Sequence, residues 1–220
     1  DINFRLNDYF AKFSNKKYQL KIKQASFSSR DSSFVARLIR IFPSDKVTLN
    51  NTSDKFWSFY IPEIKTRHSR IDDFFTYNIL DLGSISIVSP SVVFTKPGIN
   101  DLIGKIELTK DTIKKSLSFN QIKFDELEVK DGVFGISKQE KGLEEPILTT
   151  GFNLQLKSSK VDSTIFSNPG DFINNLSALL SLSKLHFQTR DSLKYIEIDK
   201  IDLNTSEKNI YGNGFRLINR

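Results

Sequence analysis

The chain carries few residues that could do acid–base or metal chemistry, and their spacing does not gather them. It contains 2 histidines, His68 and His186, and no cysteine. His68 lies in the polar run Arg67-His68-Ser69-Arg70, and His186 alternates with apolar residues in a strand-like pattern. Neither has a histidine or carboxylate at the close spacing of a metal pair. A Ser-His-Asp triad stays open because its members need not be close in sequence, although the Gly-x-Ser-x-Gly nucleophile motif is absent.

Paired carboxylates and a short glycine motif are the other candidates for chemistry. The carboxylates occur as Asp72-Asp73, Asp125-Glu126 and Glu144-Glu145, where neighbours on a strand point to opposite faces and neighbours in a loop are solvated. The run Gly212-Asn213-Gly214 lacks the third glycine and the following helix of a dinucleotide fingerprint. We therefore expect a protein that is not an enzyme and that has no metal site and no cofactor.

The basic residues are concentrated in the first third of the chain. Residues 1–70 hold 14 Lys and Arg against 6 Asp and Glu, whereas residues 71–220 hold 18 against 20. The aromatic residues fall mostly on the apolar side of the strand pattern, which disfavours stacking on nucleic acid bases. An anionic membrane surface and a plain solvated strand face both stay open. The predicted basic surface consists of Lys16, Lys17, Lys21, Lys23, Arg37 and Arg40.

The elements that must position these residues follow from apolar spacing. Positions Leu20, Ile22, Ala25 and Phe27 are separated by two, three and two residues, and this irregular spacing occurs 4 times in the chain. A step of two keeps side chains on one face of a strand, and an extra residue at a β-bulge can absorb the step of three. Each copy therefore predicts a long strand with a bulge or bend at its centre. The other copies are Leu80, Leu82, Ile85, Ile87; Ile122, Phe124, Leu127, Val129; and Ile196, Ile198, Ile201, Leu203.

Turn residues follow each copy and predict a returning strand. Ser89-Pro90 and Asp131-Gly132 match at an offset of 42, and the turns after Phe27 and Leu203 match at an offset of 176. The pattern predicts a mostly β fold with a few short helices, in which long bent hairpins build an elongated, curled antiparallel sheet. We expect one module over residues 1–220, a fragment of a larger protein. Its parts are a helix at about 2–14 and hairpins at about 17–42, 79–97, 118–138 and 193–218; the segment Phe172 to Leu182 fits a helix or a strand.

Two stretches carry a resemblance to a known family. They are Phe59-Tyr60-Ile61-Pro62-Glu63-Ile64 and the run from Ile79 to Phe94, which reads Ile-Leu-Asp-Leu-Gly-Ser-Ile-Ser-Ile-Val-Ser-Pro-Ser-Val-Val-Phe. This arrangement resembles the AsmA-like family of Gram-negative envelope proteins, and the units Tyr18 to Pro43 and Tyr195 to Ile218 resemble the repeats of such proteins. The chain departs from the pattern where Gly132 stands in place of a counterpart of Pro90.

The resemblance implies a function in lipid transport or outer-membrane biogenesis. AsmA-like proteins are anchored in the inner membrane and project β-sheets into the periplasm, where an apolar groove is proposed to conduct phospholipids, as in bridge-like lipid-transfer proteins. On this basis we expect a periplasmic location, an inner-membrane anchor outside this chain, and phospholipid or another acyl lipid as partner. The groove would be lined by Leu20, Ile22, Phe27, Leu80, Leu82, Ile85, Ile87, Phe124, Leu127, Val129, Ile198, Ile201 and Leu203.

Two alternatives use the same residues differently. The apolar positions would equally suit the closed core of a two-layer β-sandwich, because a dry core and a lipid groove both need one apolar face. A structural or adaptor subunit of an envelope complex would instead bind protein partners through strand edges and the basic N-terminal surface.

Overall fold

The part of the chain that the structure describes forms one sheet of strands. The computed structural model describes residues 17–44, 56–70, 77, 79–97, 121–140, 143–162, 177–189 and 193–219. Its strands are β1 (Tyr18–Ser28), β2 (Ser33–Pro43), β3 (Phe56–Arg67), β4 (Ile79–Asp81), β5 (Ser84–Val88), β6 (Ser91–Pro97), β7 (Gln121–Glu140), β8 (Leu143–Asp162), β9 (Ser177–Gln188), β10 (Lys194–Asn204) and β11 (Asn209–Asn219).

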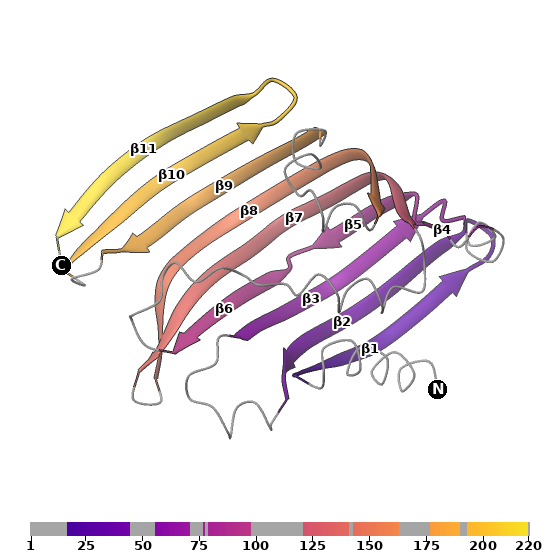
Figure 1. Ribbon diagram of the computed structural model, residues 1–220, viewed down its shortest axis with the longest axis horizontal. Helices are drawn as coiled ribbons and strands as arrows, with labels where there is room; N and C mark the ends of the chain where they lie inside the picture. Colours follow the sequence, from indigo (N-terminus) through magenta and orange to yellow (C-terminus); the bar gives the residue numbers. More distant parts are fainter. Residues whose placement is uncertain are drawn as a thin grey trace.

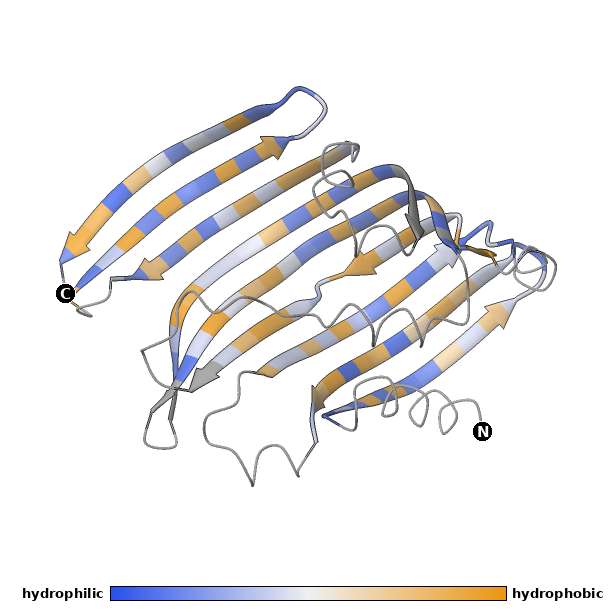
Figure 2. Cartoon of the chain, viewed as in Figure 1, coloured by the Kyte–Doolittle hydropathy of each residue, from blue (hydrophilic) through white to orange (hydrophobic). Residues whose placement is uncertain are grey.

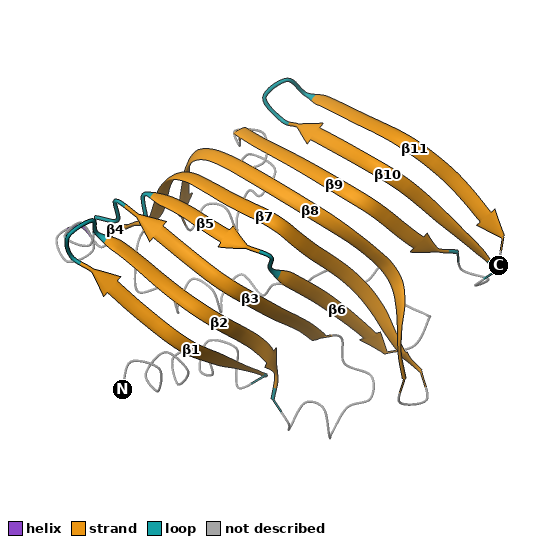
Figure 3. Cartoon of the chain, turned by 180° about the vertical axis from the view of Figure 1, so that it is seen from behind, coloured by secondary structure: helices purple, strands orange, loops and turns teal. Residues whose placement is uncertain are grey.

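The strands form one curved layer in nearly sequential order. The 11-stranded sheet runs β1-β2-β3-β5-β7-β8-β9-β10-β11, with β6 continuing the line of β5 and β4 pairing with β7. Figures 1 and 3 show the long strands bent into arcs within this layer. The predicted mostly β, curled sheet is confirmed, and the described residues contain no second sheet of a sandwich. The sheet is mixed rather than wholly antiparallel, because β4, β5 and β6 each pair with β7 in parallel.

Two of the predicted hairpins are confirmed. β1 pairs with β2 from Tyr18↔Pro43 to Ser28↔Ser33, and β10 pairs with β11 from Lys194↔Asn219 to Asn204↔Asn209. Adding 176 to the first and last residue numbers of β1 and β2 gives those of β10 and β11. The two hairpins therefore form a structural repeat at the two edges of the sheet.

The predicted hairpins at 79–97 and 118–138 are wrong. β5 and β6 run in one direction, both antiparallel to β3 and both parallel to β7. β7 continues through Asp131 and Gly132 for 20 residues. Ser89 and Asp131 have the left-handed φ angles of 48° and 52° that a turn would use, but here they only bend a strand. β5 and β6 both stay parallel to β7 through the bend, because the paired residues differ by 42 in number before it and after it.

The three-residue step marks a bend, but no residue is inserted there in the two hairpins. Lys23 faces Leu38 at the one interruption of the first ladder, and the register is the same on either side of it. Asp199 faces Gly214 in the same way in the second. Leu38 and Gly214 have φ angles of 53° and 70°, so a left-handed residue on the partner strand produces the bend that an extra residue was expected to produce. Register shifts do occur, in the β7–β8 and β8–β9 ladders.

Other sequence predictions fall partly or wholly outside the described residues. The helix at about 2–14 lies outside them. Of the segment Phe172 to Leu182, the part from Ser177 onward belongs to β9 and is a strand.

Apolar and polar residues alternate along the strands, as the colours of Figure 2 show, so the sheet has one mainly apolar face and one mainly polar face. The most buried apolar residues lie in the inner strands β2, β5, β7 and β9, and among the described residues no large side chain is completely buried. These most buried residues are Ala36, Ile39, Ile85, Phe124, Val129 and Ala178.

Candidate functional site

The apolar face carries an unbroken row of apolar residues that crosses the sheet perpendicular to its strands. Each member is the register partner of the next, and the row passes through 9 strands from β1 to β11. With about 4.8 Å between neighbouring strands, the row is roughly 38 Å long. We call it the central row; its members are Ala25, Ala36, Ile64, Ile87, Val129, Leu154, Leu180, Leu203 and Ile210.

A second row of apolar cross-strand partners lies on the same face, displaced along the strands from the central row. It is rich in aromatic rings at its β3 end, where the ring centroids of Trp57 and Phe94 are 4.6 Å apart and those of Trp57 and Phe134 are 6.4 Å apart. Such contacts hold large apolar side chains in fixed positions. This aromatic row consists of Trp57, Phe94, Ile136, Leu148, Phe187, Ile196 and Leu217.

The members of the central row on inner strands are buried or half-buried, and those on the two edge strands are exposed. Val129, in β7, is 6% exposed, whereas Ile210, in the edge strand β11, is 71% exposed. Leu154, Leu180 and Leu203 between them are half-buried. The row therefore offers continuous apolar surface that is only partly covered.

Of the residues predicted to line a groove, Ile87, Val129 and Leu203 belong to the central row, and none belongs to the aromatic row. The predicted residues come from β1, β4, β5, β7 and β10, together with Leu82 between β4 and β5, and only Ile85-Leu127 and Ile87-Val129 are cross-strand partners of each other. Ile85, Phe124 and Val129 are buried, and Phe27 is 51% exposed. The others are half-buried: Leu20, Ile22, Leu80, Leu82, Ile87, Leu127, Ile198, Ile201 and Leu203.

Residues that the sequence interpretation missed complete the central row. Ala36, Ile64, Leu154 and Leu180 come from β2, β3, β8 and β9, which lie between the strands of the predicted set. Alternation of apolar residues in these segments was visible, as at Phe152, Leu154 and Leu156. The strand order that places them beside one another was not.

On the polar face, part of the predicted basic surface lies against aromatic rings. Lys21 and Arg40 are cross-strand partners. The ammonium of Lys21 lies 5.0 Å from the ring centroid of Phe42, and the guanidinium of Arg40 lies 5.4 Å from that of Tyr60. Together with Ser58, Ser91 and Val93 they line an open hollow of about 410 Å³.

The other predicted basic residues are arranged differently. The Arg37 Nε donates a hydrogen bond of 2.7 Å to the Glu63 carboxylate on β3, which neutralises its charge. Lys17 and Lys23 are exposed, and Lys16 lies outside the described residues. The residues that keep positive charge on this part of the sheet are therefore mainly on β1 and at Arg40.

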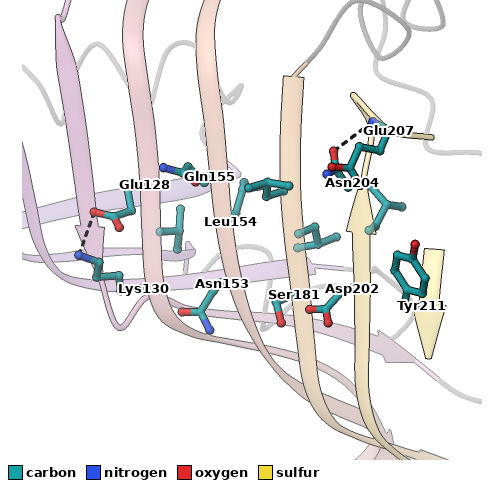
Figure 4. Close-up of a pocket in the computed structure, with 14 residues that line it drawn as sticks. Glu128, Lys130, Asn153, Leu154, Gln155, Ser181, Asp202, Asn204, Glu207 and Tyr211 are labelled. Atoms are coloured by element: carbon teal, nitrogen blue, oxygen red, sulfur yellow. Dashed lines mark hydrogen bonds and ion pairs between the residues drawn. The ribbon is translucent and has the colours of Figure 1, made fainter. Parts of the chain in front are cut away.

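A larger open hollow, of about 520 Å³, lies over β7 to β11. Figure 4 shows Ser181 and Asp202 side by side on neighbouring strands, and Lys130 next to Glu128, with 2.9 Å between nitrogen and oxygen. Hydrogen bonds from Lys200 and Ser181 lower the pKa of Asp202, and the Lys200 nitrogen is 2.8 Å from its carboxylate. Glu128 and Asp202 are thus each paired with a nearby cation.

No protein-family model matches the chain. No curated protein sequence matches it either. The described part of the chain has no helix with the length and apolar character that a membrane span requires.

The histidines lie far from each other in different settings. His68 follows β3 with a φ of 60° and is exposed. His186 lies 3.3 Å from the Glu197 carboxylate, which also pairs with Arg216 at 3.4 Å. In the ranges that the structure describes, no three His, Cys, Asp or Glu side chains come close enough to hold a metal ion. That the chain is not an enzyme stays a prediction.

Proposed function

We propose that the chain is a non-enzymatic, AsmA-like module that shields lipid acyl chains on its apolar face and contributes to lipid transport or outer-membrane biogenesis. The observation that carries the proposal is the central row, which is continuous across 9 strands and only half-buried over much of its length. A periplasmic location and an inner-membrane anchor outside this chain belong to the same proposal and rest on the family resemblance.

The physical requirement for a lipid path is apolar cover without a gap. Exposing a 16-carbon acyl chain to water costs about 12 kcal/mol, at about 0.8 kcal/mol for each methylene. A row that runs perpendicular to the strands can accompany such a chain from one strand to the next. Leu154, Leu180 and Leu203 follow one another on β8, β9 and β10 without an intervening polar residue.

The partial exposure of the apolar face favours a groove over a closed core. A closed core normally contains several large side chains that are fully buried. Among the described residues no large side chain is, and Phe27, Phe215 and Leu217 are more than half exposed.

A lipid-loading measurement tests the proposal. The protein would be purified from membranes in mild detergent, and native mass spectrometry with lipid extraction would report bound phospholipid. We expect the Leu180→Asp variant to lose the lipid, since it puts a charge into the central row. Leu179→Asp is the matched control, because Leu179 is the neighbouring residue of β9 on the opposite face and is 42% exposed.

Both variants would be checked by circular dichroism for an unchanged fold. Lipid absent from the wild-type protein, or retained equally by both variants, would contradict the groove. If Leu180→Asp unfolds, Leu180→Ser replaces it as the test of the same position.

A second candidate function is a structural or adaptor subunit of an envelope complex. The observation that favours it is the exposure of the edge strand β11, in which Ile210, Tyr211 and Phe215 are all more than half exposed. A stable stoichiometric protein complex that contains no lipid would support this function in place of the first.

A further inference from the structure

The edge of the sheet at β11 is open along its whole length. β11 stands last in the strand order, and every residue from 210 to 219 is exposed. The opposite edge differs, because four residues in the first half of β1 are half-buried. An exposed edge strand presents a line of backbone N–H and C=O groups to which another strand can bind.

β11 lacks most of the features that natural proteins use to block such an edge. It contains no proline and no lysine, and its one charged residue is Arg216. The Arg216 guanidinium is held by carboxylates of β10, at 2.5 Å from Asp199 and 3.4 Å from Glu197. Its charge is therefore neutralised within the sheet and does not repel an incoming strand.

The bend at Gly214 does not block the edge either. Leu38 occupies the equivalent place in β2 and has the same left-handed conformation. β2 nevertheless pairs on its outer side with β3, in one register on both sides of the bend, from Phe34↔Thr66 to Ile41↔Phe59. The backbone shape of β11 is thus one that already carries an outer strand elsewhere in the molecule.

We propose that the outer edge of β11 binds a further protein strand, antiparallel, in the place that β3 has beside β2. The partner strand would carry apolar residues at the two-three-two spacing. Its residues on this face would lie opposite Leu217, Phe215, Gly212 and Ile210, as Phe59, Ile61, Ile64 and Thr66 lie opposite Ile41, Ile39, Ala36 and Phe34 of β2.

The side chains of β11 specify this partner further. Gly212 occupies the position of Ala36, and a Cβ placed on Gly212 would meet only the Lys200 carbonyl oxygen, at 3.9 Å. A large aliphatic residue therefore fits opposite Gly212, as Ile64 fits opposite Ala36. Bound in this way, the partner would extend the central row by one strand, whether or not the row carries lipid.

A peptide with the sequence of residues 56–67 is the probe, because it is the strand that the equivalent edge binds. Fluorescence anisotropy of the labelled peptide would measure its affinity for the intact chain. Two N-methylated forms test backbone pairing: one is methylated at Trp57, Phe59 and Ile61, and the other at Ser58 and Tyr60. Since alternate amides face the protein in a strand pair, one form should lose binding by about tenfold or more and the other should keep it.

Substitutions in β11 test the face and register. Phe215→Asp should weaken peptide binding about tenfold, because Phe215 belongs to the apolar face. Tyr211→Asp is the matched control on the opposite face, with 64% exposure against 67% for Phe215, and should change the affinity less than about twofold. Equal effects of both substitutions, or of both methylated peptides, would overturn the proposal. A concentration-dependent dimer that Phe215→Asp abolishes would also overturn it, by showing a second copy of the chain as the occupant.

Discussion

Leu38 and Gly214 adopt the same left-handed backbone conformation at equivalent points of two hairpins, 176 residues apart in the chain. Their φ angles are 53° and 70°, and each faces the one residue of its partner strand, Lys23 or Asp199, at which the ladder is interrupted. The turns agree as well, with Ser32 at 48° and Lys208 at 55°. The bend is therefore a repeated feature of the fold. Glycine adopts the left-handed conformation at no steric cost in one hairpin, and leucine adopts it with strain in the other.

Replacing Gly214 by alanine should destabilise the protein by about 1–2 kcal/mol. The residue has a positive φ, and a Cβ there would collide with the Asp199 side chain. Gly212→Ala is the control, because a Cβ at Gly212 would make only an ordinary contact with the Lys200 carbonyl oxygen, at 3.9 Å. We expect its stability to stay within about 0.5 kcal/mol of the wild type. Urea denaturation measures both variants, and equal stabilities would contradict the role of Gly214 in the bend.

The cost of truncating the central row should follow burial. Val129→Ala removes methyl groups from a buried site and should cost about 1–2 kcal/mol, whereas Ile210→Ala, at the open edge, should cost less than about 0.5 kcal/mol. Thermal unfolding of the two variants provides the comparison. A cost at Ile210 as large as that at Val129 would mean that the edge is covered.

Stability at low pH should depend on Asp202. Hydrogen bonds from Lys200 and Ser181 hold its pKa in the folded protein below the ordinary value of 3.8. A depressed folded-state pKa stabilises the fold above the ordinary value, and that contribution is lost as the pH falls through the folded pKa. Asp202→Asn should therefore lose less stability than the wild type between about pH 5 and pH 3. Identical pH dependence of the two proteins would count against these hydrogen bonds.

Binding to anionic vesicles should depend on Lys21 and Arg40, the basic residues of the 410 Å³ hollow. Charge reversal at Lys21 and Arg40 should weaken sedimentation with phosphatidylglycerol vesicles by about tenfold or more, at about 1 kcal/mol for each basic residue near the surface. Lys194→Glu, an exposed position on β10, is the control. The difference should shrink as salt is raised. Equal losses of vesicle binding in the Lys21/Arg40 variant and in Lys194→Glu would show that binding depends on overall charge and not on this surface.

The sequence patterns predicted local geometry better than pairing. The offset of 176 correctly placed two hairpins, because their turns and their partners lie within the same short segment. The offset of 42 was also real, but it equals the parallel register in which Ile87 pairs with Val129 and Val92 with Phe134. Two strands that lie side by side share the same pattern, so the repeat alone could not separate neighbouring strands from successive hairpins.

The same limit applies to the candidate site. Left-handed residues such as Ser89 and Asp131 occur in turns and in bends, and only the strands on either side decide which of the two forms. Leu154 was recognisable as a strand residue, and Leu180 fitted a helix or a strand. Their places in the central row depend on contacts between distant segments. The spacing of apolar residues along a strand predicts on which face of the sheet each one lies. The row to which a residue belongs depends on the order of the strands in the sheet.

The most direct test of the lipid proposal is site-specific photo-crosslinking along the central row. A photoreactive residue would be placed at Ile64, Leu154 or Leu203, and, as controls on the opposite face, at Lys65, Gln155 or Asp202, one position at a time. We expect phospholipid adducts, identified by mass spectrometry, at the three central-row positions and none at their neighbours. Adducts in equal amount on both faces, or none on the central row of a folded protein, would contradict the lipid proposal.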